Sequence, residues 1–254
     1  MKIDFHVHQP ARQPDGTYPF TADEYIAYMD ELGIDISVML TIDGFWQDPV
    51  ACNDYLAEWI SRASVPGRLI AYCTVDPRKP GAADEVERCV TKLGMRGIKL
   101  HNWLQGFSPL EEFMAPVCEK AAELGIPLFF HDGTPPYSTP LQIAHLAVRH
   151  PNLNVVLGHA GLHDMWQEAI AAGRRHRNVY LCMSATPPFA MERIVAEVPL
   201  EQIVFGTDGG LFHQPRQPYV DYRFREFETL DIPSETKSRI LGENALRLLG
   251  LEWK

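Results

Sequence analysis

The sequence predicts an α/β protein that folds as a (β/α)8 TIM barrel, a single domain covering residues 1–254. Three observations lead to this fold. The chain of 254 residues matches the length of about 250 residues that such barrels need. Eight short apolar runs alternate with helical patterns, as repeated β–α units require. The alternative, an open doubly wound sheet, usually has a glycine-rich strand-to-helix turn near its start, and this sequence has none there.

Each apolar run is rich in Val, Ile, Leu or Phe and has about the length of a buried strand. The runs occupy residues 3–7, 34–42, 69–75, 97–100, 126–130, 155–157, 179–183 and 203–205. The intervals between them are long enough for one crossover helix each, which parallel neighbouring strands require. The pattern therefore predicts eight parallel strands with helices between them.

Signals for the starts and ends of helices fall in these intervals. A cap residue followed by Pro, or by an acidic residue three positions later, predicts a helix start. Such starts are Thr21 with Glu24, Asp48 with Pro49, Ser108 with Pro109 and Thr139 with Pro140, and we also expect Ser234 to open the C-terminal helical region. Glycine predicts a helix end because it adopts the left-handed cap conformation without strain. Such ends are Gly33, Gly94 and Gly125.

The composition restricts the partners of the chain. A formal net charge of −10 repels phosphate backbones, so we expect no nucleic-acid partner. The five cysteines are scattered singly, which argues against a disulfide framework. The sequence shows no signal-peptide pattern and no apolar stretch approaching the roughly 20 residues of a membrane helix. We expect a cytoplasmic protein that binds a small-molecule substrate and no membrane, and the sequence leaves open whether it forms a homo-oligomer.

Polar residues follow five of the eight predicted strands. They are His6 and His8, His101, His131, His159, and Asp208. Active sites of such barrels lie where the carboxyl ends of the strands meet. The sequence therefore predicts that these residues gather at one end of the barrel.

Side chains alternate between the two faces of a strand. His6 and His8 should therefore share a face, and we expect Ile3, Phe5 and Val7 to face the outer helices. Both histidines would then point into the barrel.

The same alternation applies to the later strands. Asp208 shares a face with Val204, and His159 shares a face with Val155 and Leu157, and we expect both polar groups to converge on the barrel mouth. Two imidazoles two residues apart form a chelating pair for a divalent metal, and a further His and a carboxylate complete a catalytic ligand set.

These residues and their order along the chain resemble the amidohydrolase superfamily, in the branch called amidohydrolase family 2. The resemblance covers essentially the whole chain. It rests on residues 3–8 (IDFHVH), 96–101 (RGIKLH), 131–138 (HDGTPPYS), 156–161 (VLGHAG), 205–208 (FGTD) and 244–249 (NALRLL).

The resemblance implies a divalent metal, usually zinc, at the barrel mouth. With one ion, which we favour, the ligands would be His6, His8, His131 and Asp208. His159 would then act in proton transfer or substrate orientation. The resemblance leaves open a second ion, bridged by a carboxylated Lys from the fourth strand.

Lys99 is the residue that such a bridge would need. It could equally pair with Asp4 or bind a substrate carboxylate. His101 shares its strand face, and we expect it to support the site by a hydrogen bond rather than to bind metal.

From the resemblance we expect a metal-dependent hydrolase acting on a small polar or carboxylate-bearing metabolite. The metal would lower the pKa of its bound water toward about 7. Asp208 would take the water proton and return it to the leaving group, and His159 would polarise the substrate carbonyl. The same branch includes non-oxidative decarboxylases of unsaturated or aromatic carboxylic acids, so a metal-dependent decarboxylase (a lyase) is the alternative. A nuclease, which the negative charge disfavours, and a non-catalytic barrel are two further alternatives.

Substrate selection is expected from the loops that follow the strands. Trp46, Trp103 and Tyr137 are candidates for an apolar wall, and Arg12 or Arg216 for a cationic anchor of an acidic substrate. His213 lies in the same loop as Arg216.

Overall fold

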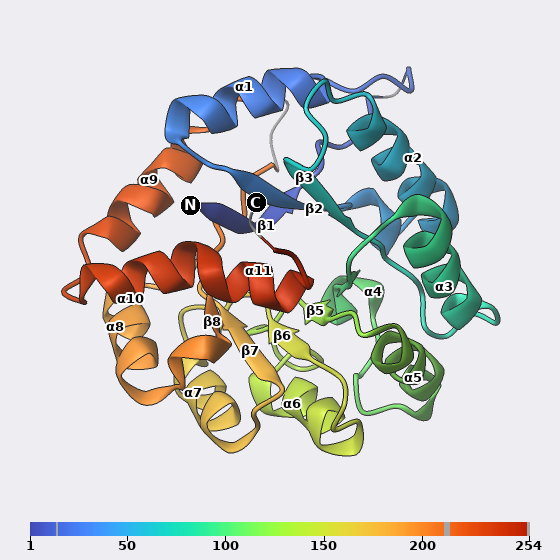
Figure 1. Ribbon diagram of the computed structural model, residues 1–254. Coiled ribbons are helices and arrows are strands. Elements are labelled where there is room, and N and C mark those ends of the chain that lie inside the picture. The colour runs from blue at the N-terminus through green and yellow to red at the C-terminus, as the bar shows by residue number, and fades with distance from the viewer. Residues whose placement is uncertain (14, 211–213, 253–254) are drawn as a thin grey trace.

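The computed structural model describes residues 1–13, 15–210 and 214–252, which fold as the predicted TIM barrel (Figure 1). Each of the eight apolar runs contains a strand. The strands are β1 (Ile3–His8), β2 (Ile36–Leu40), β3 (Leu69–Tyr72), β4 (Ile98–Leu100), β5 (Leu128–Phe130), β6 (Val155–Leu157), β7 (Val179–Cys182) and β8 (Ile203–Val204).

The parallel strands close on themselves. Continuous pairing joins β1 to β3 in one sheet and β4 to β8 in another. Parallel bridges join the two sheets at both seams, Cys73 with Ile98 between β3 and β4, and Val7 with Gly209 between β1 and the end of β8. At the second seam the His8 N–H donates to the Gly209 carbonyl at 2.7 Å. The carboxyl ends of all eight strands therefore face the same side of the barrel.

Helices surround the strands (Figure 1). They are α1 (Ala22–Leu32), α2 (Pro49–Ser61), α3 (Ala82–Leu93), α4 (Asn102–Gln105), α5 (Ala115–Leu124), α6 (Pro140–Arg149), α7 (Trp166–Arg175), α8 (Pro188–Glu197), α9 (Pro218–Glu228), α10 (Ser234–Ser238) and α11 (Asn244–Leu249), with short turns η1 (Asp43–Phe45), η2 (Glu112–Met114), η3 (Leu200–Gln202) and η4 (Arg239–Glu243). Within the described ranges, no helix has both the length and the apolar character needed to cross a bilayer.

Most of the predicted helix signals act as expected. Thr21 and Glu24 form a reciprocal capping box at the start of α1, and Gly33 ends that helix with a φ of 65°. A second capping box opens α6. The expected start at Ser108 is wrong, because its hydroxyl accepts from the Leu110 N–H in a turn and the helix begins later, after η2.

The strands separate an outer apolar core, beneath the helices, from an inner core that fills the barrel. The inner core consists of Ile3, Phe5, Ile36, Val38, Leu40, Tyr72, Phe129, Val156, Cys182 and Val204, with Ala245, Leu246, Leu248 and Leu249. The last four belong to α11, which crosses the amino-terminal end of the barrel (Figure 1). Helix α11 therefore covers the amino-terminal end of the barrel, opposite the ends of the strands that carry the polar residues.

Strand β1 departs from the expected alternation. Ile3 and Phe5 lie in the inner core, and only Val7 lies in the outer core. The pairing of β1 with β2 shifts between Asp4 and Val7, which is the effect of a β-bulge. The expectation that Ile3 and Phe5 face the helices is therefore wrong, and His6 faces the interior because the bulge reverses the side-chain order.

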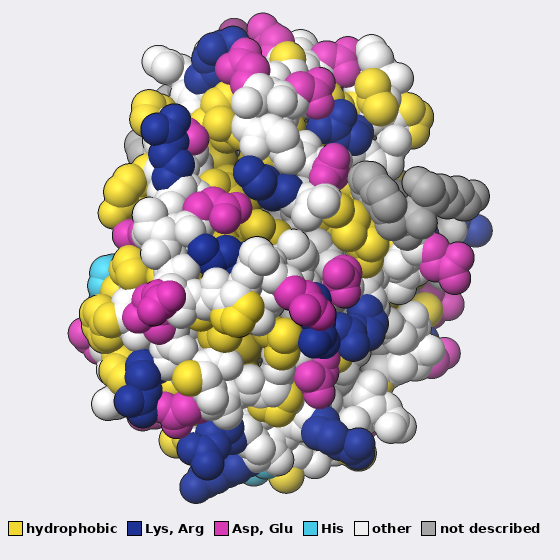
Figure 2. Space-filling model, turned by 60° about the vertical axis from the view of Figure 1, so that its left-hand side comes forward, with side chains coloured by type: hydrophobic (Ala, Val, Ile, Leu, Met, Phe, Trp, Pro, Cys, Tyr) yellow, Lys and Arg dark blue, Asp and Glu magenta, His cyan; other side chains and the backbone are white. Residues whose placement is uncertain are grey.

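Charges of both signs are interspersed on the face that includes α8 and α9 (Figure 2). Several of them are paired within one helix turn, as Arg193 is with Glu197 and Arg225 is with Asp221. Exposed pairs of this kind contribute little stability, about 0.3–0.5 kcal/mol each. This face therefore presents a mixed polar surface.

Candidate metal centre

Two histidines of β1 meet one carboxylate from the end of β8. The Nε2 atoms of His6 and His8 each lie 3.1 Å from Asp208 Oδ1. The Asp208 N–H donates to the His6 carbonyl at 2.9 Å. This close approach requires Gly206, because a Cβ there would lie 2.6 Å from the Cβ of His6.

Backbone strain is concentrated at this end of the barrel. Among the described residues, four that are not glycine have a positive φ: Ala160, Leu162, Ala185 and Asp208, at 47°, 52°, 55° and 64°. All four follow β6, β7 or β8. Such conformations cost about 1–3 kcal/mol each and tend to gather at functional sites.

Burial and their mutual contacts set the protonation of His6, His8 and Asp208. Burial lowers the pKa of His8, and lowers that of His6 well below its usual value. Burial raises the pKa of Asp208, but the interactions with His6 and His8 outweigh it and hold the pKa well below its usual range. Neutral imidazoles beside an ionised carboxylate are the protonation state that metal ligands need.

Lys99 lies against the same group. Its Nζ is 3.2 Å from His6 Nε2, and burial lowers the pKa of Lys99 to about 8, although Asp208 acts in the opposite direction. Lys99 thus contacts a candidate ligand, and its carboxylation to hold a second ion stays a prediction.

Three further histidines form a connected chain. His159 Nδ1 donates to the Ser184 carbonyl at 3.1 Å, and His159 Nε2 lies 2.8 Å from His131 Nδ1. A carbonyl only accepts, so the His159 proton is on Nδ1 and its Nε2 accepts from His131. His131 Nε2 in turn accepts from the Thr134 hydroxyl at 2.9 Å. The ring of His101 stacks on His131 with centroids 3.8 Å apart.

A turn after β6 brings His159 inside. Val155 and Leu157 lie in the outer core, so the alternation used to place His159 would send it outward. The strand ends at Leu157, and the turn through Gly158 and Ala160, which has a φ of 47°, reverses that direction.

The group fits a divalent cation. His6, His159 and Asp208 each present a ligand atom within 4.8 Å of the other two. Ligands bound to one ion at about 2.1 Å are roughly 3.0–3.4 Å apart, which agrees with the 3.1 Å that separates each β1 histidine from Asp208. His131 lies one contact further out, on His159, and its role as a ligand stays a prediction.

Two residues that support the centre were not recognised in the sequence. The Asp132 carboxylate accepts from the N–H groups of His159 and Gly161, both at 2.6 Å, and so fixes the turn that carries His159. The Ser184 hydroxyl lies 3.1 Å from His6 Nδ1 and 3.3 Å from His159 Nδ1. The position of Asp132 directly after β5 is a signal that could have found it, whereas nothing in the sequence marks Ser184.

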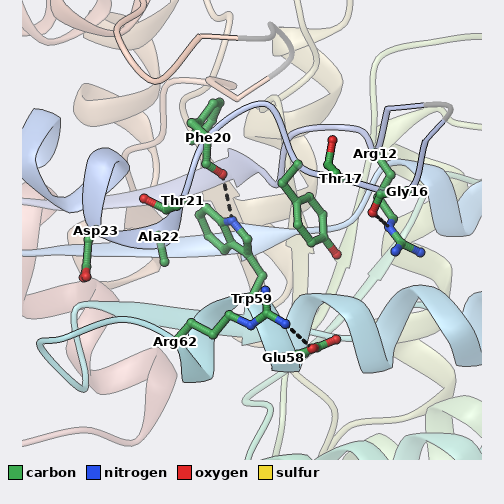
Figure 3. A pocket seen from close by; sticks show the side chains of 11 residues that line it. Arg12, Gly16, Thr17, Phe20, Thr21, Ala22, Asp23, Glu58, Trp59 and Arg62 are labelled. Carbon is green, nitrogen blue, oxygen red and sulfur yellow. Dashed lines mark hydrogen bonds and ion pairs between the residues drawn. The ribbon is translucent and has the colours of Figure 1, made fainter.

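The two arginines expected to anchor a substrate have partners of their own. Arg12 Nε donates to the Gly16 carbonyl at 3.0 Å. Arg12 lines a cavity of about 450 Å³ between the β1–α1 loop and α2, and none of the site histidines lines it (Figure 3). Arg216 pairs with Glu31 of α1. His213 lies outside the described residues.

The aromatic candidates extend outward from His101. The ring centroids of Phe45 and Trp103 lie 5.3 and 6.3 Å from that of His101. Trp46, Trp103 and Tyr137 are 57%, 45% and 41% exposed. Trp46 packs against Phe45 with ring centroids 6.4 Å apart, so Phe45, Trp46 and Trp103 form an aromatic wall that leads from His101 toward solvent.

Comparison with known families agrees with this geometry. The family profile described as amidohydrolase matches residues 3–251. The chain belongs to this family. It is an enzyme of the amidohydrolase superfamily, as the resemblance implied.

Curated relatives of this amidohydrolase are decarboxylases. It is 24% identical over 234 residues to the gamma-resorcylate decarboxylase of Polaromonas sp. (strain JS666), which covers 74% of this chain and 68% of the relative. It is 26% identical over 284 aligned residues to the 2-amino-3-carboxymuconate-6-semialdehyde decarboxylase of Dictyostelium discoideum, covering 91% and 77%.

Solved structures share the fold. One is a dihydroxybenzoic acid decarboxylase from Polaromonas sp. JS666 with bound manganese and the inhibitor 2-nitroresorcinol, with a TM-score of 0.76, 20% identity, and coverage of 100% of this chain and 98% of that one. Another is the 5-carboxyvanillate decarboxylase of Sphingomonas paucimobilis, with a TM-score of 0.74, 19% identity and 99% coverage of both chains.

These relatives correct the expected activity. The hydrolase interpretation is wrong, because the two curated relatives described above are named as decarboxylases. The identity of the metal, for which we expected zinc, stays a prediction, and the solved dihydroxybenzoic acid decarboxylase named above holds manganese.

Proposed function

We propose that this chain is a metal-dependent, non-oxidative decarboxylase of an aromatic or unsaturated carboxylic acid. The observation that carries the proposal is the match to two curated decarboxylases, one named for an aromatic and one for an unsaturated acid. The candidate metal centre and the aromatic wall beside it suit such a substrate.

The proposed metal is one manganese ion. His6, His8 and Asp208 would hold it, with either His159 or His131 as the next ligand, because these two histidines meet at 2.8 Å. Mixed imidazole and carboxylate ligands are compatible with such an ion. When bound, the ion would supply the positive charge that orients the substrate carboxylate.

The reaction replaces the bond between the substrate carbon and its carboxylate with a C–H bond. A proton bonds to that carbon, the C–C bond breaks, its electron pair returns to the conjugated system, and CO2 leaves. No water is consumed. The protein must therefore deliver one proton to a carbon atom next to the metal centre.

Asp208 is the group placed to deliver that proton. Its side chain is 21% exposed, whereas those of His6 and His8 are 0% and 5% exposed, so it is the most accessible of the three to an entering substrate. It is ionised in the substrate-free centre because its pKa is held low. It must therefore first take up a proton, for which a hydroxyl of the bound substrate is a source.

The aromatic wall would hold the rest of the substrate. Trp103 is half exposed beside His101, and stacking on such a ring stabilises a planar molecule by about 0.5–1.5 kcal/mol beyond the burial of its area.

Measurement of CO2 release tests the function. Protein loaded with Mn²⁺ is incubated with 2,6-dihydroxybenzoate, 5-carboxyvanillate or an unsaturated dicarboxylic acid, and loss of substrate is followed by absorbance. We expect CO2 from at least one class, abolished by a chelator and restored by Mn²⁺. Turnover of esters, lactones or amides without CO2 from any of the acids would contradict the proposal.

A further inference from the structure

A buried hydroxyl connects two candidate ligands that lie far apart in the sequence. Ser184 follows β7 and is completely buried. Its Oγ lies 3.1 Å from His6 Nδ1 and 3.3 Å from His159 Nδ1. The nitrogen of His6 that faces Asp208 is Nε2, whereas the Ser184 hydroxyl faces Nδ1 of both rings. Ser184 is therefore neither a metal ligand nor a proton donor in the proposed reaction.

The backbone around Ser184 defines which nitrogen of each ring carries the proton. His6 Nδ1 donates to the Gly158 carbonyl at 3.2 Å, and His159 Nδ1 donates to the carbonyl of Ser184 itself at 3.1 Å. Both Nδ1 atoms therefore carry hydrogen, so each lone pair is on Nε2, where that of His6 faces Lys99 and Asp208 and that of His159 accepts from His131. The Ser184 hydroxyl is the second acceptor for both N–H groups.

The position of Ser184 is itself constrained. The next residue, Ala185, has a φ of 55°, a conformation that the surrounding contacts must maintain. The residue after it, Thr186, is held on both sides, because its hydroxyl donates to the His159 carbonyl at 2.9 Å and its carbonyl accepts from Arg223 Nη2 at 2.8 Å. The chain therefore holds the hydroxyl between the two rings.

We propose that Ser184 is a positioning residue that fixes the ring orientation of both His6 and His159, and thereby raises the affinity of the centre for its divalent ion. Hydrogen bonds from the second nitrogen of a metal-binding histidine have this effect, and their loss typically weakens metal binding about 10- to 100-fold. The inference rests on the metal centre of the proposed function, but not on decarboxylation.

Substitution of Ser184 and a control serine tests this inference. Ser37 is also fully buried, on β2, but among the residues that the structure describes its hydroxyl has no hydrogen-bond partner. Metal-stripped protein is titrated with Mn²⁺, and free Mn²⁺ is measured by electron paramagnetic resonance. We expect Ser184→Ala to bind Mn²⁺ about 10- to 100-fold more weakly, and Ser37→Ala to bind as the unaltered protein does.

Further variants separate hydrogen bonding from packing. Ser184→Thr keeps the hydroxyl and should retain most of the affinity, whereas Ser184→Cys keeps the volume but accepts hydrogen bonds weakly and should lose it. Histidine ¹⁵N chemical shifts of the metal-free protein report the proton position directly. We expect Nδ1-protonated forms of His6 and His159 in both proteins, because the backbone carbonyls of residues 158 and 184 remain, and altered Nδ1 shifts in Ser184→Cys, because the hydroxyl acceptor is lost.

Each outcome separates the inference from the proposed function. Unchanged Mn²⁺ affinity and unchanged ¹⁵N shifts in Ser184→Cys would overturn the role of Ser184. Tight Mn²⁺ binding without CO2 release would overturn the proposed function alone. Absence of Mn²⁺ binding by the unaltered protein would overturn both.

Discussion

The carboxyl group of Asp4 provides a test of how burial affects stability beside the metal centre. Its oxygens accept from the Thr207 N–H and hydroxyl at 2.9 and 2.6 Å and from the His6 N–H at 3.3 Å. Burial raises the pKa of Asp4 from 3.8 to about 7, even though the bonds from Thr207 act to lower it.

The direction of the pH effect follows from this shift. In the unfolded chain the carboxyl has a pKa of about 3.9. Between about pH 4 and 7 the folded state therefore binds more protons than the unfolded state, so the free energy of unfolding falls as pH rises, and the effect levels off above pH 7. Each pKa unit corresponds to about 1.4 kcal/mol, so Asp4 accounts for a loss of up to about 3 kcal/mol between pH 5 and 8.

Asp4→Asn should remove this loss. The asparagine carbonyl can accept from the same N–H groups and its amide can donate to the Thr207 hydroxyl, but it does not ionise. We expect the free energy of unfolding to fall by up to about 3 kcal/mol less in the variant than in the unaltered protein between pH 5 and 8. Asp132, whose pKa burial also raises to about 7, contributes equally to both proteins and cancels.

The measurement is urea denaturation of metal-free protein at pH 5, 6, 7 and 8, in the presence of a chelator. Equal m-values would show that the same surface is exposed on unfolding. Parallel pH profiles for the two proteins would refute the reasoning, because they would mean that Asp4 is already ionised in the folded state at pH 5.

Five other substitutions test the site. Asp208→Asn should lower both Mn²⁺ content after dialysis and CO2 release by at least about 100-fold, and retention of either would remove Asp208 from the ligands. His159→Ala should lose more Mn²⁺ than His131→Ala, because His159 is the one grouped with Asp208; the reverse order would make His131 the ligand. Trp103→Ala should raise KM for an aromatic acid up to about tenfold, from the loss of about 0.5–1.5 kcal/mol of stacking, and an unchanged KM would exclude it from the wall. Arg216→Gln should leave KM unchanged because Arg216 pairs with Glu31, and a large increase would restore it as a substrate anchor.

The apolar runs predicted the strand ends that carry polar residues. Side-chain alternation did not predict how those residues enter the barrel. The bulge in β1 places both Phe5 and His6 in the interior, which strict alternation forbids. His159 reaches the interior only because a strained turn at Ala160 follows a strand whose alternation points the other way.

The type of a single residue also did not predict which partner its side chain binds in the folded protein. Arginines in loops are natural candidates for anchoring an acid, yet Arg12 bonds to Gly16 and Arg216 to Glu31. Ser184 is an unremarkable residue in the sequence, and its place between two imidazoles depends on a partner 178 positions away.

The sequence by itself determined the eight strands, several helix boundaries and the family, because apolar periodicity, capping residues and short motifs act over a few neighbouring positions. Only the tertiary structure decided which histidines meet Asp208, where their protons lie and which arginines already have partners. Those properties depend on hydrogen bonds and burial between segments that closure of the barrel brings together, and no local pattern in the chain encodes them.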